Sequence, residues 1–165
     1  MYKHIILIRH AQAEGIQSGL KDIERRLTSE GSKDAMRMGK LLFEANIIPD
    51  LILSSSAERT TETTRYVCEQ LDFDFEKVAF EEDLYESSVR LLVKSIEKIN
   101  SEHKCVFLIA HNPSISYLAE YLTGEVIGNL PPCGVVNLSS EIDSWKEISQ
   151  GSCELIKFYD PSSFD

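Results

Sequence analysis

Runs of consecutive apolar residues alternate along the chain with longer stretches in which apolar residues recur every three or four positions. The runs at 4–8 and 105–110 are almost continuously apolar, which predicts strands buried on both faces of a sheet. Shorter apolar runs predict further strands at 51–53, 78–80, 134–138 and 154–158.

The amphipathic stretches between these runs predict helices. Thr28 is the expected N-cap of a helix that reaches about residue 46, and Pro113 suits the first turn of a helix that reaches about residue 122. Two more helices are expected over 57–71 and around 89–99. This alternation predicts an α/β fold, in which helices cover both faces of a mostly parallel central sheet.

Composition and charge limit the classes of protein that fit. The 165 residues, 42% hydrophobic and 27% charged, predict a single domain over 1–165. No apolar run approaches the roughly 18 residues that cross a bilayer, and the start of the chain lacks the pattern of a signal peptide, so we expect a cytoplasmic protein that binds no membrane. The net charge of −10 argues against nucleic-acid binding and requires any phosphate site to be a local basic pocket. We expect a monomer, because no heptad or exposed apolar helix is evident.

Histidine and arginine side chains follow the predicted buried strands. Arg9 and His10 end the first strand, Arg59 lies one turn beyond the second, and His111 and Asn112 follow the strand at 105–110. Ligands of parallel α/β sheets bind beyond the carboxyl ends of the strands. We therefore expect these side chains to form one site.

The chemistry of this set suits phosphoryl transfer. A neutral imidazole such as that of His10 can attack phosphorus and hold the phosphoryl group covalently, which divides one difficult displacement into two easier ones. The guanidinium groups of Arg9 and Arg59 match phosphate oxygens, and a protonated His111 would add a third donor. Nearby positive charge favours a neutral, nucleophilic His10. The alternatives are structural histidines with arginines in ion pairs, or a metal site. The metal site lacks a third ligand at a usual spacing, so we expect no metal and no other cofactor.

Three segments resemble the signature segments of the histidine phosphatase superfamily, once called the phosphoglycerate mutase-like fold. They are Arg-His-Ala-Gln-Ala-Glu at 9–14, the arginine segment at 53–63 and Ala-His-Asn-Pro at 110–113. The first of these segments, a later Arg26-Leu27-Thr28 with Gly31, and the short chain are most similar to the SixA-type phosphohistidine phosphatase branch. Ala11 stands where the superfamily more often has glycine.

The resemblance implies a role for each matching residue. His10 would be the nucleophile that becomes phosphorylated. Arg26 would lie near the mouth of the pocket. The residues implied in substrate binding are Arg9, Arg26, Arg59, His111 and Asn112.

A general acid for the leaving group is the open question. Glu86 lies in a segment similar to the acid segment of some relatives, and Glu82 and Asp83 compete for the role. An alkoxide leaving group needs a proton, whereas the imidazole that leaves phosphohistidine is a better leaving group and needs a weak acid or none. Glu86 is therefore either the general acid or a solvated loop carboxylate.

Three functions follow from this reasoning. The first is dephosphorylation of phosphohistidine in a partner protein through phosphorylated His10, since a short chain leaves little material for a lid. The second is hydrolysis of a small phosphate ester, which requires Glu86 as a working acid. The third, of a different class, is a non-catalytic phosphate-binding or phosphorelay module. The apparently complete set of Arg9, His10, Arg59 and His111 argues against the third.

Overall fold

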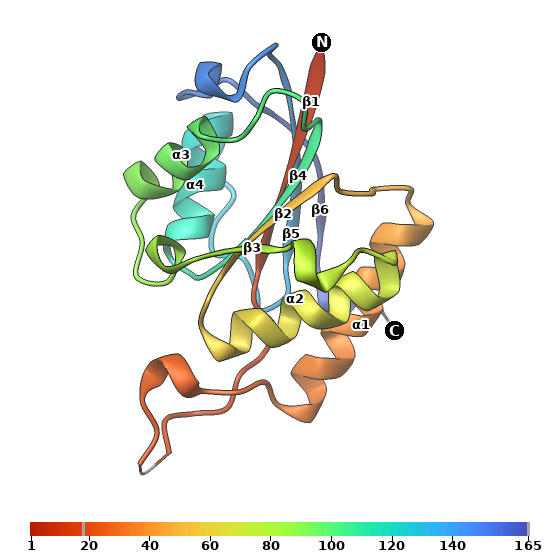
Figure 1. Ribbon diagram of the computed structural model, residues 1–165, viewed down its shortest axis with the longest axis vertical. Coiled ribbons are helices and arrows are strands. Elements are labelled where there is room, and N and C mark those ends of the chain that lie inside the picture. Colours follow the sequence, from red (N-terminus) through yellow and green to blue (C-terminus); the bar gives the residue numbers. More distant parts are fainter. Residues whose placement is uncertain (18, 165) are drawn as a thin grey trace.

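A mixed sheet forms the centre of the computed structural model, which describes residues 1–17 and 19–164 (Figure 1). Within this described part of the chain the strands are β1 (Tyr2–Arg9), β2 (Leu51–Ser55), β3 (Ala79–Glu81), β4 (Cys105–Ala110), β5 (Val135–Glu141) and β6 (Glu154–Tyr159). Their order across the sheet is β3-β2-β4-β1-β5-β6. The predicted strand regions are thus confirmed.

The direction of the strands brings the signature segments together. β1, β2, β3 and β4 run parallel, whereas β5 pairs antiparallel with both β1 and β6. In the register of β1 and β4, Arg9 lies opposite Ala110. Because both strands end at the same edge of the sheet, the residues that follow them, His10 and His111, start from neighbouring positions.

Helices cover both faces of the sheet. The pair α1 (Ser29–Glu44) and α2 (Glu58–Leu71) lies on one face, and the pair α3 (Val89–Glu97) and α4 (Ser114–Thr123) lies on the other (Figure 1). The expected α/β fold with a mostly parallel sheet between helices is confirmed. Within the described residues, no helix has both the length and the apolar character that a membrane span requires.

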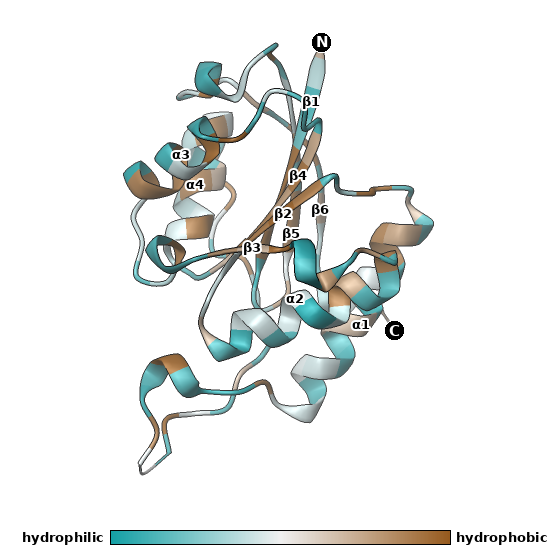
Figure 2. Cartoon of the chain, in the orientation of Figure 1, coloured by the Kyte–Doolittle hydropathy of each residue, from teal (hydrophilic) through white to brown (hydrophobic). Residues whose placement is uncertain are grey.

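Alternation along β1 divides the core into two layers. Ile5 and Leu7 pack with the residues of α3 and α4, whereas Ile6 and Ile8 pack with those of α1 and α2. All four side chains are essentially inaccessible to solvent. The hydrophobic colouring of the central strands in Figure 2 reflects this burial on both faces, which explains why the run lacks polar alternation.

The helix ends follow local signals closely. The Thr28 side chain accepts a hydrogen bond from the backbone N–H of Gly31 at 3.0 Å, so Thr28 is the N-cap of α1 as expected. Pro113 lies at the N-cap position of α4, one residue before the predicted first turn. Two helices are shorter than predicted: α1 ends at Glu44 and α3 ends at Glu97.

The described part of the connection between β1 and α1, residues 10–17 and 19–28, folds back toward the sheet edge. It contains a single-turn 3-10 helix, Asp22–Glu24, and a bridge between Ala13 and Leu27. A close approach of this connection to α1 requires a glycine, because a Cβ at Gly31 would lie 2.1 Å from the backbone oxygen of Gln12. The fold-back places Asp22 beside the carboxyl ends of the strands.

Candidate active site

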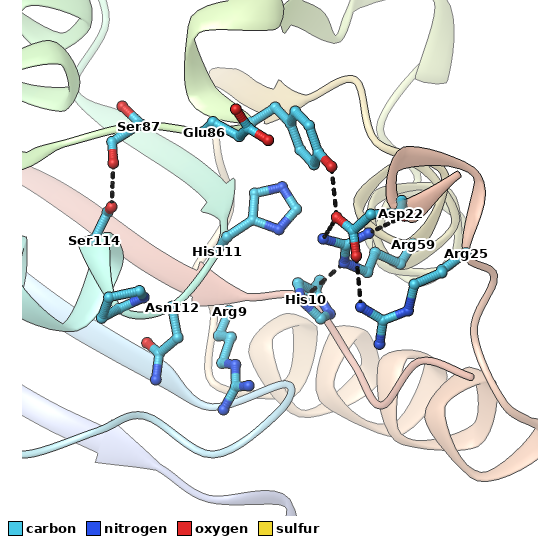
Figure 3. A pocket seen from close by; sticks show the side chains of 12 residues that line it. Arg9, His10, Asp22, Arg25, Arg59, Glu86, Ser87, His111, Asn112 and Ser114 are labelled. Carbon is cyan, nitrogen blue, oxygen red and sulfur yellow. Dashed lines mark hydrogen bonds and ion pairs between the residues drawn. The ribbon is translucent and has the colours of Figure 1, made fainter. Parts of the chain in front are cut away.

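A pocket of about 360 Å³ lies at the carboxyl ends of β1 and β4 (Figure 3). The sequence predicted seven of the residues that line it, counting Pro113 of the second histidine segment, and did not predict the other five. The lining residues are Arg9, His10, Asp22, Arg25, Arg59, Tyr85, Glu86, Ser87, His111, Asn112, Pro113 and Ser114. The expected juxtaposition of the two histidines with Arg9 and Arg59 is therefore present.

His10 is buried and held in one orientation. Its Nδ1 atom lies 2.7 Å from the backbone oxygen of Ala11. Because a carbonyl oxygen only accepts, Nδ1 carries the proton of the neutral ring and Nε2 keeps its lone pair. Burial lowers the pKa of His10 to about 4. The charges of Arg59 and Arg9 act in the same direction, and the bond to Ala11 opposes them. His10 is consequently neutral at pH 7, with a basic nitrogen available for attack.

Arg59 contacts that basic nitrogen. Its Nε atom lies 3.4 Å from Nε2 of His10. The side chain is only 7% exposed, although Arg59 is the second residue of α2. A cation this close to the imidazole can bind an oxygen of any group that His10 attacks.

His111 lies beside His10, with the ring centroids 5.2 Å apart. Its Nε2 atom is 2.8 Å from the hydroxyl of Ser55 and 3.3 Å from that of Thr60. Its Nδ1 atom is buried and has no hydrogen-bond partner among the described residues. Burial lowers the pKa of His111 to about 3, and the charges of His10 and Arg59 lower it further. The ring is therefore neutral without a ligand, and only a bound anion would favour the protonated donor considered from the sequence.

The side chains of Arg9 and Asn112 donate to the same backbone oxygen. Nη1 of Arg9 donates to the oxygen of Leu130 at 2.8 Å, and Nδ2 of Asn112 reaches the same oxygen at 3.4 Å. The side-chain oxygen of Asn112 accepts a hydrogen bond from Ser116 of α4. Nε of Arg9 is buried and has no partner among the described residues. A buried N–H without a partner is unfavourable, which makes it a candidate donor to an anion in the pocket.

Arg25 lines the pocket, whereas Arg26, which the resemblance placed near the pocket mouth, does not. The side chain of Arg26 is 69% exposed and pairs with Glu62 at 3.4 Å, away from the pocket. Arg25 lines the pocket and donates to Asp22 at 2.8 Å and to the backbone oxygen of Glu14 at 2.7 Å. The backbone at Arg25 is extended, so consecutive side chains point to opposite sides. An error of one residue in the expected position is therefore enough to select Arg26, which points away from the pocket, in place of Arg25.

Asp22 and Tyr85 are pocket residues that the sequence did not predict. The Asp22 carboxylate accepts hydrogen bonds from the Tyr85 hydroxyl, Arg25 and Arg59, and these contacts lower its pKa (Figure 3). The Tyr85 ring lies edge-on to His111, with 5.5 Å between centroids. No sequence signal distinguishes Asp22 from its acidic neighbours, whereas Tyr85 directly precedes the candidate acid Glu86.

Glu86 lines the pocket, whereas its competitors Glu82 and Asp83 do not. The Glu86 side chain is exposed at the rim. The segment that carries it is attached to α4, because the Ser114 hydroxyl donates to the backbone oxygen of Ser87 at 2.5 Å. Among the described residues, no group of three His, Cys, Asp or Glu side chains is arranged to hold a metal ion.

Comparisons with known proteins agree with this geometry. The model of the histidine phosphatase superfamily (branch 1) matches residues 5–92. An uncharacterised chloroplastic protein of Arabidopsis thaliana is 29% identical over 153 residues, which cover 88% of this chain and 70% of that protein.

Two solved structures share the fold over almost their whole length. One, assigned as the phosphohistidine phosphatase SixA of Agrobacterium tumefaciens, is 25% identical, with a TM-score of 0.83 over 96% of this chain and 98% of that one. The other, the protein histidine phosphatase SixA complexed with tungstate, is 19% identical, with a TM-score of 0.85 over 98% of this chain and 99% of that one. The SixA-type resemblance noted from the sequence is thereby confirmed at the level of the fold.

Proposed function

The chain belongs to the histidine phosphatase superfamily and is a phosphatase, and from this premise we propose that it dephosphorylates phosphohistidine in a protein through a covalent intermediate at His10. One observation carries the proposal: a buried, neutral His10 directs Nε2 into the pocket, with Arg59 Nε 3.4 Å away. A nitrogen with a free lone pair beside a fixed cation meets the requirements for attack on a phosphoryl group.

The reaction would proceed in two displacements. Nε2 of His10 forms a bond to phosphorus while the bond from phosphorus to the imidazole nitrogen of the substrate breaks. The departing imidazole keeps that electron pair and takes up a proton. Water then attacks the phosphorus atom, the bond from phosphorus to Nε2 of His10 breaks, and the electron pair returns to Nε2. The proton that water loses leaves with inorganic phosphate or to solvent, and His10 is again a neutral imidazole. Both displacements develop charge on the equatorial oxygens, which Arg9, Arg59 and His111 in the pocket lining would bind.

Two further residues complete the proposed binding set. Asn112 would hold the pocket wall next to Arg9 through their common contact with Leu130. Arg25 would take the role at the pocket mouth that the sequence suggested for Arg26, because it lines the pocket and Arg26 does not.

Two features favour a phosphohistidine substrate. The match to the Agrobacterium SixA structure covers 98% of that chain, so the two molecules have nearly the same elements around the pocket. Glu86, the only carboxylic acid besides Asp22 among the described lining residues, is exposed at the rim. An imidazole leaving group needs a proton donor less than an alkoxide does, so an exposed acid at the rim is sufficient for it.

The second candidate is a phosphatase for small phosphate esters with Glu86 as general acid. Glu86 lines the pocket, which favours Glu86 over Glu82 and Asp83 as that general acid. The two substrate classes make different demands on this acid, because only the ester releases a strongly basic oxygen.

Phosphate release from two donors tests the proposal. The donors are a histidine-containing protein phosphorylated with phosphoramidate and a small alkyl phosphate. We expect wild type to act at least about tenfold more efficiently on the phosphoprotein, and His10→Ala to be inactive on both. Glu86→Gln should leave activity on the phosphoprotein within about twofold of wild type, as should the control Glu82→Gln outside the pocket. Preference for the ester, together with loss of that activity in Glu86→Gln, would instead establish the second candidate.

A further inference from the structure

Asp22 binds Arg59 at two points. Its backbone oxygen accepts from Nη1 of Arg59 at 2.8 Å, and its carboxylate accepts from Nη2 at 3.1 Å. The third nitrogen of the guanidinium, Nε, is the atom that faces His10. Asp22 therefore holds the outer edge of the planar group while the inner edge points toward the nucleophile (Figure 3).

Asp22 is itself fixed from two other parts of the chain. Arg25, in the same connection, donates to one carboxylate oxygen at 2.8 Å, and the Tyr85 hydroxyl donates to the other. The proton of the Tyr85 hydroxyl is thus engaged by Asp22, and burial together with this bond raises the pKa of Tyr85. The carboxylate joins α2, the β1–α1 connection and the segment before α3 at the pocket wall.

We propose that Asp22 is a positioning residue, which orients the guanidinium of Arg59 so that its Nε edge faces the phosphoryl group on His10. The proposal rests on the proposed function above. A guanidinium on a flexible stem has many rotamers, and a catalytic contact requires one of them. Two hydrogen bonds to the outer edge select the productive rotamer without using Nε.

A competing interpretation makes the opposite prediction. If the carboxylate occupied the place of the phosphoryl group, its removal would improve anion binding and raise activity. The geometry argues against this, because the carboxylate lies on the Nη2 side of Arg59, whereas the phosphorus must lie in line with His10 Nε2.

A double-mutant cycle of kcat/KM with the phosphohistidine protein tests the proposal. Asp22→Asn should lower kcat/KM about tenfold or more in the wild-type background and less than about twofold in the Arg59→Lys background, since lysine has no second edge to orient. Tyr85→Phe should cause a smaller loss, which disappears in the Asp22→Asn background. Glu58→Gln removes an exposed negative charge next to Arg59 and should leave kcat/KM unchanged in both the wild-type and the Arg59→Lys backgrounds. Equal losses from Asp22→Asn in both backgrounds, or a gain of activity, would overturn the proposal.

A second measurement is independent of turnover. The ¹⁵N resonances of the His10 ring report its protonated fraction in wild type and in Asp22→Asn. Release of Arg59 from its position beside Nε2 should raise the pKa of His10, whereas the simple loss of a nearby negative charge should lower it. A pKa that falls or stays constant contradicts the positioning role. If wild type has no activity dependent on His10, the proposed function fails, and this titration still decides the role of Asp22.

Discussion

The Nδ1 atom of His10 lies 2.7 Å from the carbonyl oxygen of Ala11, and this contact determines which ring nitrogen faces the pocket. It fixes the proton on Nδ1 and leaves the lone pair of Nε2 next to Arg59. A backbone carbonyl achieves this without a carboxylate partner, which would make the ring more basic and favour its protonated form. Burial lowers the pKa of His10, and the bond to Ala11 offsets only part of that effect.

The pH dependence of activity should reflect that low pKa. The neutral form of His10 is the nucleophile, so activity is lost as pH falls through the pKa of about 4, not through the ordinary value near 6.5. We expect kcat/KM to stay level from pH 7 to about pH 5. Initial rates of phosphate release over this range check the prediction. A decline centred near pH 6.5 would show that His10 is not held neutral by its surroundings.

The two adjacent arginines should differ strongly in their effect on activity. Arg25→Ala removes a cation that lines the pocket, together with one support of Asp22, and should lower kcat/KM about tenfold or more. Arg26→Ala removes an exposed side chain paired with Glu62 and should leave kcat/KM within about twofold of wild type. Steady-state kinetics of both variants provide the comparison. The reverse order of effects would restore the assignment made from the sequence.

Gly31 should be indispensable for stability. A Cβ at this position would lie 2.1 Å from the backbone oxygen of Gln12, which no side-chain rearrangement can relieve. Gly31→Ala should therefore destabilise the protein by about 1–3 kcal/mol or more, as measured by urea unfolding. Gly15→Ala is the matched control, because its Cβ would meet nothing within 4 Å. Unchanged stability of Gly31→Ala would mean that the connection does not approach α1 so closely.

The sequence was most informative where function depends on strand ends. Arg9, His10 and His111 follow the buried strands β1 and β4 directly, and parallel strands must end at a common edge. The placement of Arg25 and Asp22 depends instead on how residues 19–28 fold back. An extended segment reverses the direction of its side chains with each residue, so periodicity could not choose between Arg25 and Arg26. The contact of Asp22 with Tyr85 joins segments 63 residues apart and has no local signal in either.

Covalent catalysis by His10 is the central claim, and a rapid alkaline-quench trap tests it most directly. The protein is mixed with an isotopically labelled phosphodonor, quenched within milliseconds, and assayed for acid-labile, base-stable label in wild type and in His10→Ala. We predict transient label on wild type and none on the variant. Hydrolysis of the donor by wild type without label on the protein at any time would contradict the account, because phosphate would then be released without a phosphorylated His10.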